Sequence, residues 1–126
     1  MNINVNSCGI AAYGGSKATP NAITAAKELG YNIETHRSEP IGNRIIENTD
    51  LIICMERAHK LRIEKMFPST AERLFLFSEF VGQTGDIEDP IGKNLYVYRN
   101  VARTIEKYTK RLANVLEKRY KYSEKV

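Results

Sequence analysis

The sequence has little cysteine and no long apolar run, and both absences limit what the chain can be. Its two cysteines, Cys8 and Cys54, lack the close spacing of a metal site or a redox pair. We therefore expect two reduced, buried thiols, no metal and no cofactor. No apolar stretch approaches the length of a membrane span, and residues 1–7 lack the basic start and apolar run of a secretory signal. These features predict a cytoplasmic protein without a membrane partner.

The chain also lacks a concentration of charge of one sign. It has 19 Lys and Arg against 15 Asp and Glu, a formal net charge of +4, with the two signs interleaved along most of its length. No stripe of basic residues with stacking aromatics appears, so no nucleic-acid partner is predicted. With 42% hydrophobic residues, 126 residues supply one core and not two. Residues 1–126 are therefore predicted to form a single domain.

Three short segments have the pattern of strands. Residues 3–7 alternate apolar and polar side chains, and residues 51–55 and 73–77 are apolar runs rich in strand-forming residues. Helices are predicted between them, since Thr19 and Gly30 are typical of a helix start and a helix end. Strands separated by helices pair in parallel with right-handed crossovers, which indicates the α/β class.

Further helical segments follow from apolar spacing. A short helix is predicted over residues 43–48, and another over residues 57–66, which Pro68 ends. A long amphipathic helix is predicted around apolar positions spaced by three and four residues, and residues 118–126 are expected to be a frayed, charged tail. Its apolar positions are Val101, Ile105, Tyr108, Leu112 and Val115.

Six short stretches follow one another in a characteristic order and spacing. They are residues 7–13, 18–22, 29–33, 36–38, 50–55 and 86–90. Together they resemble the low-molecular-weight protein tyrosine phosphatase family. The likeness runs from about Val5 to about Leu116 and depends on order and spacing more than on any single motif. It implies a three-layer αβα fold around a parallel sheet.

One part of the family pattern has no match in this sequence. Family members open with a strand, a Cys-x5-Arg-Ser loop and a helix, which precede the segment that resembles residues 3–7. That loop cradles phosphate with backbone N–H groups and an arginine, and lowers the pKa of its cysteine. Six positions after Cys8 stands Gly14, and six after Cys54 stands Lys60. The resemblance therefore implies a chain that lacks the first strand, the first helix and the phosphate loop, and is inactive alone.

Three residues match family site positions, and each also has a purely structural interpretation. Asp89, before Pro90, matches the general acid that protonates the leaving oxygen; without the family, Asp-Pro after a glycine-rich stretch is turn chemistry. Tyr13 matches an aromatic wall for the substrate ring, or is an exposed loop residue. His36 matches a histidine that supports the phosphate loop, or is a satisfied structural residue.

Three functions remain open. The first is a truncated phosphatase whose relatives hydrolyse phosphotyrosine proteins or small aryl phosphates through a cysteinyl-phosphate intermediate. The second is a non-catalytic binding module of the same fold. The third, an arsenate reductase, requires further redox cysteines that residues 80–89 do not contain. Without the opening helix of the family, one face of the sheet beside the long C-terminal helix would be uncovered. Exposed apolar surface tends to bind a partner, so self-association through the incomplete sheet is also predicted.

Overall fold

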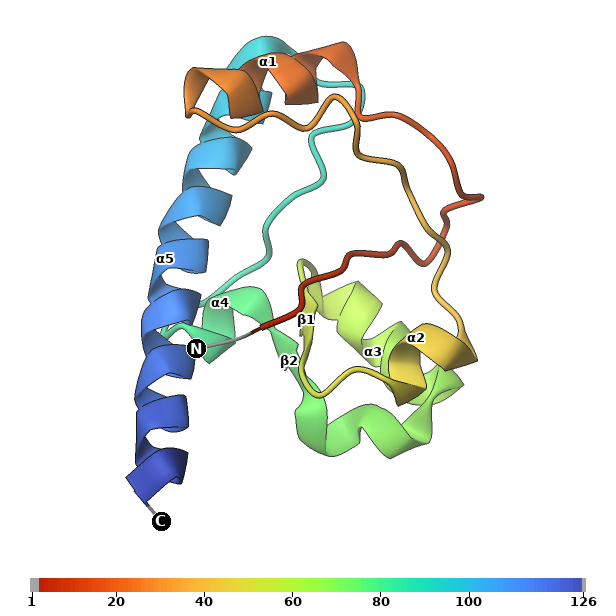
Figure 1. The fold of residues 1–126 in the computed structure, drawn as a ribbon. Coiled ribbons are helices and arrows are strands. Elements are labelled where there is room, and N and C mark those ends of the chain that lie inside the picture. Colours follow the sequence, from red (N-terminus) through yellow and green to blue (C-terminus); the bar gives the residue numbers. More distant parts are fainter. Residues whose placement is uncertain (1–2, 126) are drawn as a thin grey trace.

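The computed structural model describes residues 3–125, with side chains described for residues 3–119. Its elements follow one another in the order α-helix, α-helix, strand, α-helix, 3-10 helix, strand, and two α-helices (Figure 1). They are α1 (Pro20–Glu28), α2 (Asn43–Glu47), β1 (Ile52–Cys54), α3 (Arg57–Met66), η1 (Pro68–Arg73), β2 (Leu74–Leu76), α4 (Phe77–Phe80) and α5 (Leu95–Lys125).

The two strands form a parallel pair with a helix layer on each face. In β1 and β2, Ile52 lies opposite Leu74, and Cys54 lies opposite Leu76. Ile52 and Cys54 pack toward α3, while Ile53 packs against a second cluster that includes residues of α4 and α5. This alternation is the period of two that a strand imposes on its side chains. The predicted α/β class and the parallel pairing are confirmed.

The predicted first strand is not formed, and this prediction was wrong. Residues 3–7 have no strand assignment and are exposed, with Val5 at 83%. No backbone hydrogen bond joins residues 3–8 to another described part of the chain. Residues 3–7 do alternate apolar and polar side chains, but a strand also needs a neighbouring strand edge to form hydrogen bonds with. The second edge of β1 likewise carries no strand within residues 3–125, so the described sheet has only two strands.

The sequence correctly predicted where the first three helices lie. Thr19 is the N-cap of α1, where its Oγ1 accepts a hydrogen bond from the Ala22 amide at 3.4 Å. Gly30 follows the helix at a φ of 93°, a conformation that favours glycine. The predicted helices at residues 43–48 and 57–66 are also present. Capping and stop residues act within a few positions, so they can be read from the sequence directly.

The structure adds two short helices that the sequence did not predict. Residues 68–73 form η1, and Phe77, expected at the end of a strand, instead begins α4. The long helix α5 begins at Leu95 and continues through Lys125, beyond the start of the predicted frayed tail at Lys118. Side chains from residue 120 onward lie outside the described part, so a charged tail stays a prediction. Within the described residues, no helix is long and apolar enough to cross a membrane.

Helix α5 connects the two halves of the molecule. Figure 1 shows α1 across one end of α5 and α4 beside its middle. Val101 and Ile105 of α5 pack into the cluster that contains Ile53 of β1, and the Arg119 guanidinium lies 5.0 Å from the centre of the Phe80 ring. The helix thus holds α1 at a fixed place relative to the sheet.

Candidate functional site

The segment around Asp89 is held at the carboxyl end of β1. The Ile87 amide donates to the Met55 carbonyl at 2.9 Å, and Asp86 Oδ1 accepts from the Arg57 amide at 2.9 Å. Ile87 is buried at 5% exposure. Parallel sheets collect their binding and catalytic groups beyond the carboxyl ends of strands. The fold therefore anchors this loop where chemistry is expected.

Asp89 itself is exposed and forms a local turn. Its Oδ1 accepts from the Ile91 amide at 3.0 Å, which is the turn geometry that the Asp-Pro pair predicts without any family. This bond uses one carboxylate oxygen within the loop and leaves the side chain accessible. The geometry is thus compatible with both the structural interpretation and the acid interpretation of Asp89.

Tyr13 and His36 lie on two segments that are bonded to each other. The Gly15 amide donates to the Ser38 carbonyl at 2.8 Å, and the Ser38 amide donates to the Ser16 carbonyl at 2.9 Å. Tyr13 is 98% exposed and His36 is also exposed. Among described residues, the His36 imidazole makes no hydrogen bond, and no contact joins either side chain to Asp89. The structure therefore brings Tyr13 and His36 into one region but does not assemble the three into one site.

The two thiols differ from each other and from a cysteine nucleophile. Cys54 is buried as predicted, at 4% exposure, and burial raises its pKa to about 11, although Lys60 acts in the opposite direction. Cys8 is exposed, so its predicted burial was wrong. Partial desolvation, followed by the charge of Glu39, raises the pKa of Cys8 as well. A nucleophilic cysteine needs the reverse shift, because the thiolate is the reactive form.

An apolar trough of about 570 Å³ lies between α1 and α5 and ends at Asp89. We call it the α1–α5 trough. Its walls are mostly alanine and larger aliphatic side chains, with Asp89, Pro90 and Ile91 at one end. The residues that line it are Thr19, Ala22, Ala25, Ala26, Leu29, Tyr31, Ile33, Asp89, Pro90, Ile91, Tyr98, Val101, Ala102, Ile105, Glu106 and Thr109.

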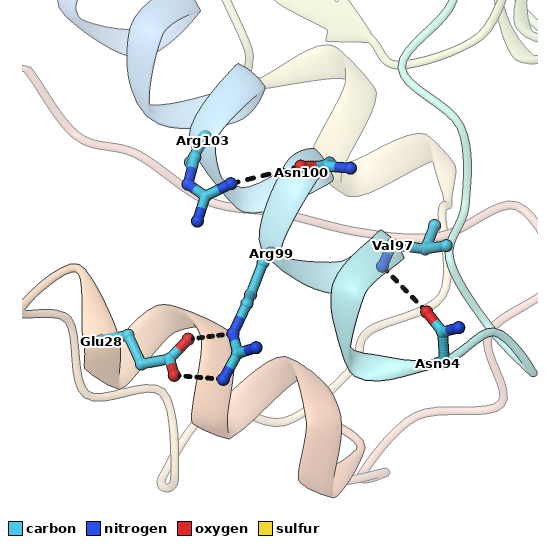
Figure 2. Close-up of polar contacts among 6 residues, drawn as sticks. All are labelled: Glu28, Asn94, Val97, Arg99, Asn100 and Arg103. Atoms are coloured by element: carbon cyan, nitrogen blue, oxygen red, sulfur yellow. Dashed lines mark hydrogen bonds and ion pairs between the residues drawn. The ribbon is translucent and has the colours of Figure 1, made fainter.

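Polar contacts hold the two walls of the trough together. Glu28 of α1 accepts two hydrogen bonds from Arg99 of α5, both at 2.8 Å (Figure 2). The hydrogen bond from Arg99 lowers the pKa of Glu28. Thr19 donates to the Tyr98 hydroxyl at 3.1 Å, and a hydrogen bond to Glu106 raises the pKa of Tyr31. Glu28 and Arg99 are outside the lining of the trough, whereas Thr19, Tyr31, Tyr98 and Glu106 belong to it, and most of the other lining residues are apolar.

Asp86 is a site-positioning residue that the sequence did not single out. Its carboxylate caps α3 across 29 positions of the chain. Arg57 additionally pairs with Glu79, and Ser78 donates to the Gly85 carbonyl at 2.6 Å, which fixes the start of the loop. No sequence signal links these residues, because the contacts depend on how α3, α4 and the loop after α4 meet. Described residues include no cluster of His, Cys, Asp and Glu that could hold a metal ion.

Comparisons with known proteins assign the chain to a family. The model of the family "Low molecular weight phosphotyrosine protein phosphatase" matches residues 1–122. A protein-arginine-phosphatase of Bacillus subtilis is 33% identical over 119 residues, which cover 94% of this chain and 79% of that protein. The low molecular weight protein-tyrosine-phosphatase Wzb of Escherichia coli is 31% identical over 114 residues, which cover 90% of this chain and 77% of that protein.

A solved structure shows that the likeness extends to the fold. It is of a YwlE arginine phosphatase in which serine replaces a cysteine and the active-site serine is phosphorylated. It aligns with a TM-score of 0.87 at 33% identity and covers 91% of this chain and 76% of that one. On the family match and these likenesses, the chain belongs to the low molecular weight phosphotyrosine protein phosphatase family.

Proposed function

We propose that this chain is a phosphatase-like protein that carries the general-acid part of a phosphomonoesterase site but does not hydrolyse phosphate esters alone. One observation carries the proposal: neither cysteine has the surroundings of a nucleophile. Cys54 is buried with a pKa of about 11, and the pKa of Cys8 is also raised. Neither is followed six positions later by arginine, as the phosphate loop of the family requires.

The pKa of Cys54 determines how little thiolate is present. A thiol with a pKa of about 11 is ionised in only about one molecule in ten thousand at pH 7. Its burial further prevents a phosphate ester from approaching along the line of attack. The solved relative with a phosphorylated active-site serine supports a covalent phosphoenzyme route in the family, for which this chain offers no equivalent nucleophile.

The three candidate residues keep the roles that the resemblance implies. When a nucleophile is supplied, Asp89 gives its proton to the leaving atom as the bond to phosphorus breaks, an oxygen and a P–O bond for phosphotyrosine, or a guanidinium nitrogen and a P–N bond for phosphoarginine. It then accepts a proton from the water that attacks the phosphocysteine. Tyr13 forms a wall beside the substrate. His36 supports the phosphate loop, which accounts for an imidazole with no partner among the described residues.

The proposed substrate class is a phosphorylated protein side chain. The names of the Bacillus subtilis and Escherichia coli relatives point to phosphoarginine and phosphotyrosine respectively. Many family members carry an aromatic residue after the Asp-Pro pair, whereas this chain has Ile91, which is 66% exposed. An aliphatic residue there weakens the case for a tight aryl slot and leaves phosphoarginine as a substrate to be tested. Action in the cytoplasm belongs to the same proposal.

A direct assay tests the proposal. The purified chain should be incubated with para-nitrophenyl phosphate, a phosphotyrosine peptide and a phosphoarginine-containing protein, with Escherichia coli Wzb as the positive control for aryl phosphate. We expect turnover at the buffer background in the wild type, in Asp89→Ala and in the neighbouring carboxylate variant Glu88→Ala. Circular dichroism of the same samples establishes that they are folded.

Turnover that Asp89→Ala abolishes and Glu88→Ala preserves would overturn the proposal, and Cys54→Ser would then identify or exclude the nucleophile.

The second candidate function, a non-catalytic binding module, is favoured by the exposure of Tyr13 and Asp89 on loops. It requires a chain that is folded and soluble alone. A bare fragment should instead be poorly structured or aggregate until a missing segment is supplied.

A further inference from the structure

One side of α5 carries a concentration of positive charge that the order of residues in the sequence conceals. Residues 95–125 hold nine of the 19 Lys and Arg but three of the 15 Asp and Glu, so the rest of the chain has more acidic than basic residues. Positions separated by three and four residues share one side of an α-helix. This spacing places a line of basic side chains along α5, which we call the basic face. Its members are Arg99, Arg103, Lys107, Lys110, Asn114 and Lys118.

The basic face points away from the core and is only partly neutralised. The opposite side of α5 is buried, where Val101 and Ile105 pack against the sheet and α4. Arg103, Lys107 and Lys118 are exposed, and no ion pair within the described residues involves any of the three. These cations are therefore available to a partner.

A hollow of about 340 Å³ beside α5 has room for a further carboxylate. Glu28 is bonded to Arg99, while Arg103 donates to the Asn100 side chain at 3.2 Å (Figure 2). The hydrogen bond from Arg99, and more weakly the charge of Arg103, lower the pKa of Glu28, so two guanidinium groups face one carboxylate. An acidic side chain of a partner would pair with the second guanidinium. The residues that line the hollow are Ala25, Glu28, Leu29, Arg99 and Arg103.

The basic face begins next to the loop of Asp89. Asn94 Oδ1 accepts from the Val97 amide at 3.2 Å, so α5 starts within a few residues of that loop (Figure 2). Arg99, the first member of the face, follows about one turn later. From Arg99 to Lys118 the face extends about 28 Å at 1.5 Å per residue. A polypeptide that lies along it would therefore have one end near Asp89.

The side chains of this face favour an acidic polypeptide over a lipid surface or a nucleic acid. Among the described residues of α5, Tyr96 is the one large apolar side chain that is exposed. Interfacial helices insert an apolar face into the bilayer, and single-stranded nucleic acids stack on several aromatic rings. A run of carboxylates needs only a line of cations, and an extended chain of about nine residues at 3.3 Å each would span the face.

We propose that the basic face of α5 is a docking site for an acidic segment of a phosphorylated protein, and that docking brings the phosphorylated side chain to the loop of Asp89. The inference rests on the proposed function for the class of partner, and it adds the surface that binds the partner and the charge that the partner carries. Each exposed pair is weak and screened by salt, but several pairs along one line fix the direction of the bound segment. Docking also raises the local concentration of the phosphorylated residue beside Asp89.

The probe is a fluorescent peptide of about twelve residues in which glutamate alternates with serine and glycine, long enough to follow the face. The same peptide with glutamine in place of glutamate is the uncharged reference. The double variant Arg103→Gln with Lys107→Gln removes two charges from the basic face. Arg62→Gln with Lys65→Gln is its matched control, because it removes the same charge from exposed positions of α3. Glutamine is tolerated in helices, and circular dichroism establishes that both variants are folded.

Fluorescence anisotropy should show saturable binding of the glutamate peptide and none of the glutamine peptide. Affinity should fall at least fivefold between about 50 and about 300 mM salt. The α5 variant should weaken binding at least fivefold, and the α3 variant should leave it within twofold. Equal effects of the two variants, or equal affinity for the two peptides, would overturn the inference. Tighter binding of phosphatidylserine vesicles or of an oligothymidine strand would also overturn it, since the face would then serve a membrane or a nucleic acid.

A nitroxide label on each end of the glutamate peptide in turn tests whether the face leads to the candidate site. With one of the two labelled peptides, the amide resonances of residues 89–94 should broaden. Absence of broadening there with both peptides would mean that docking does not lead to Asp89, which overturns the inference. Turnover by the chain without peptide would overturn the proposed function and leave these binding results unchanged, so the two failures are distinguishable.

Discussion

At the residue scale, Cys54 is the clearest case of a side chain whose surroundings decide its chemistry. It lies in β1 against Ile63 and Leu74, and this burial favours the neutral thiol. A cysteine in a polar loop at a helix N-terminus would instead have a lowered pKa, which favours the thiolate. A cysteine in the sequence is therefore no evidence of a nucleophile until its burial is known. Cys8 shows the converse error, since its apolar neighbours predicted burial and it is exposed.

The raised pKa of Cys54 predicts how stability depends on pH. The pKa rises from an ordinary value of 9.0 to about 11 in the folded chain, so the folded state holds its proton more tightly than the unfolded state. The resulting stabilisation is complete below pH 9 and is lost as pH rises through about 11. About two pKa units correspond to about 2–3 kcal/mol. Urea unfolding between pH 8 and pH 11 measures this loss.

Lysines and tyrosines ionise in the same range, so the control must carry all of them. Cys54→Ala lacks only the thiol and should lose less stability than the wild type over that interval. Equal losses in the two proteins would contradict the assignment of the pH dependence to Cys54. Cys8→Ala, whose thiol is exposed, should retain most of the wild-type loss.

At the scale of elements, the fold depends on local residue preferences and on contacts between distant parts of the chain. Only the local preferences could be predicted from the sequence. Thr19 and Gly30 placed α1, and Pro68 marked the end of α3, because capping and chain stiffness act within one turn. The prediction of a strand at residues 3–7 was wrong. Alternating apolar and polar side chains indicate which side chains share a face, but they do not show that a neighbouring strand is present to pair with.

The site was predictable to a similar degree. The Asp-Pro pair located the loop of Asp89, since turn chemistry is local. The α1–α5 trough was not predictable, because Ala22 and Ala102 are eighty positions apart and approach only once α1 lies on α5. The support from Asp86 was missed for the same reason.

The contact between the Asp89 loop and α3 gives the second prediction. Asp86→Ala removes the acceptor for the Arg57 amide at the first turn of α3, as loss of an N-cap does elsewhere. We expect a decrease of about 1 kcal/mol in the free energy of unfolding, and faster amide exchange at Arg57 and Ile87. Glu88→Ala removes the same charge from the same loop, where the side chain is exposed, and should change stability by less than about 0.5 kcal/mol. Equal effects of the two variants would mean that Asp86 does not hold the loop.

At the scale of the whole molecule, the described chain is a phosphatase-family fold with an unprotected interior edge. Helices cover both faces of a sheet of two strands, while residues 3–7 and the outer edge of β1 stay unpaired. A net charge of +4 makes copies repel one another, and salt screens this repulsion. Pairing between the open β1 edges of two copies is thus opposed only weakly.

Self-association is therefore the last prediction, and its surface can be specified. We expect light scattering to give a mass above the monomer that rises with protein concentration and with salt, because salt screens the repulsion while apolar pairing persists. Val5→Lys places a charge in the exposed segment of residues 3–7 and should shift the equilibrium toward monomer. Leu61→Lys changes an apolar side chain of α3 that is 59% exposed and should have little effect. A chain that stays monomeric at every concentration and salt would show that the open edge is tolerated as it stands.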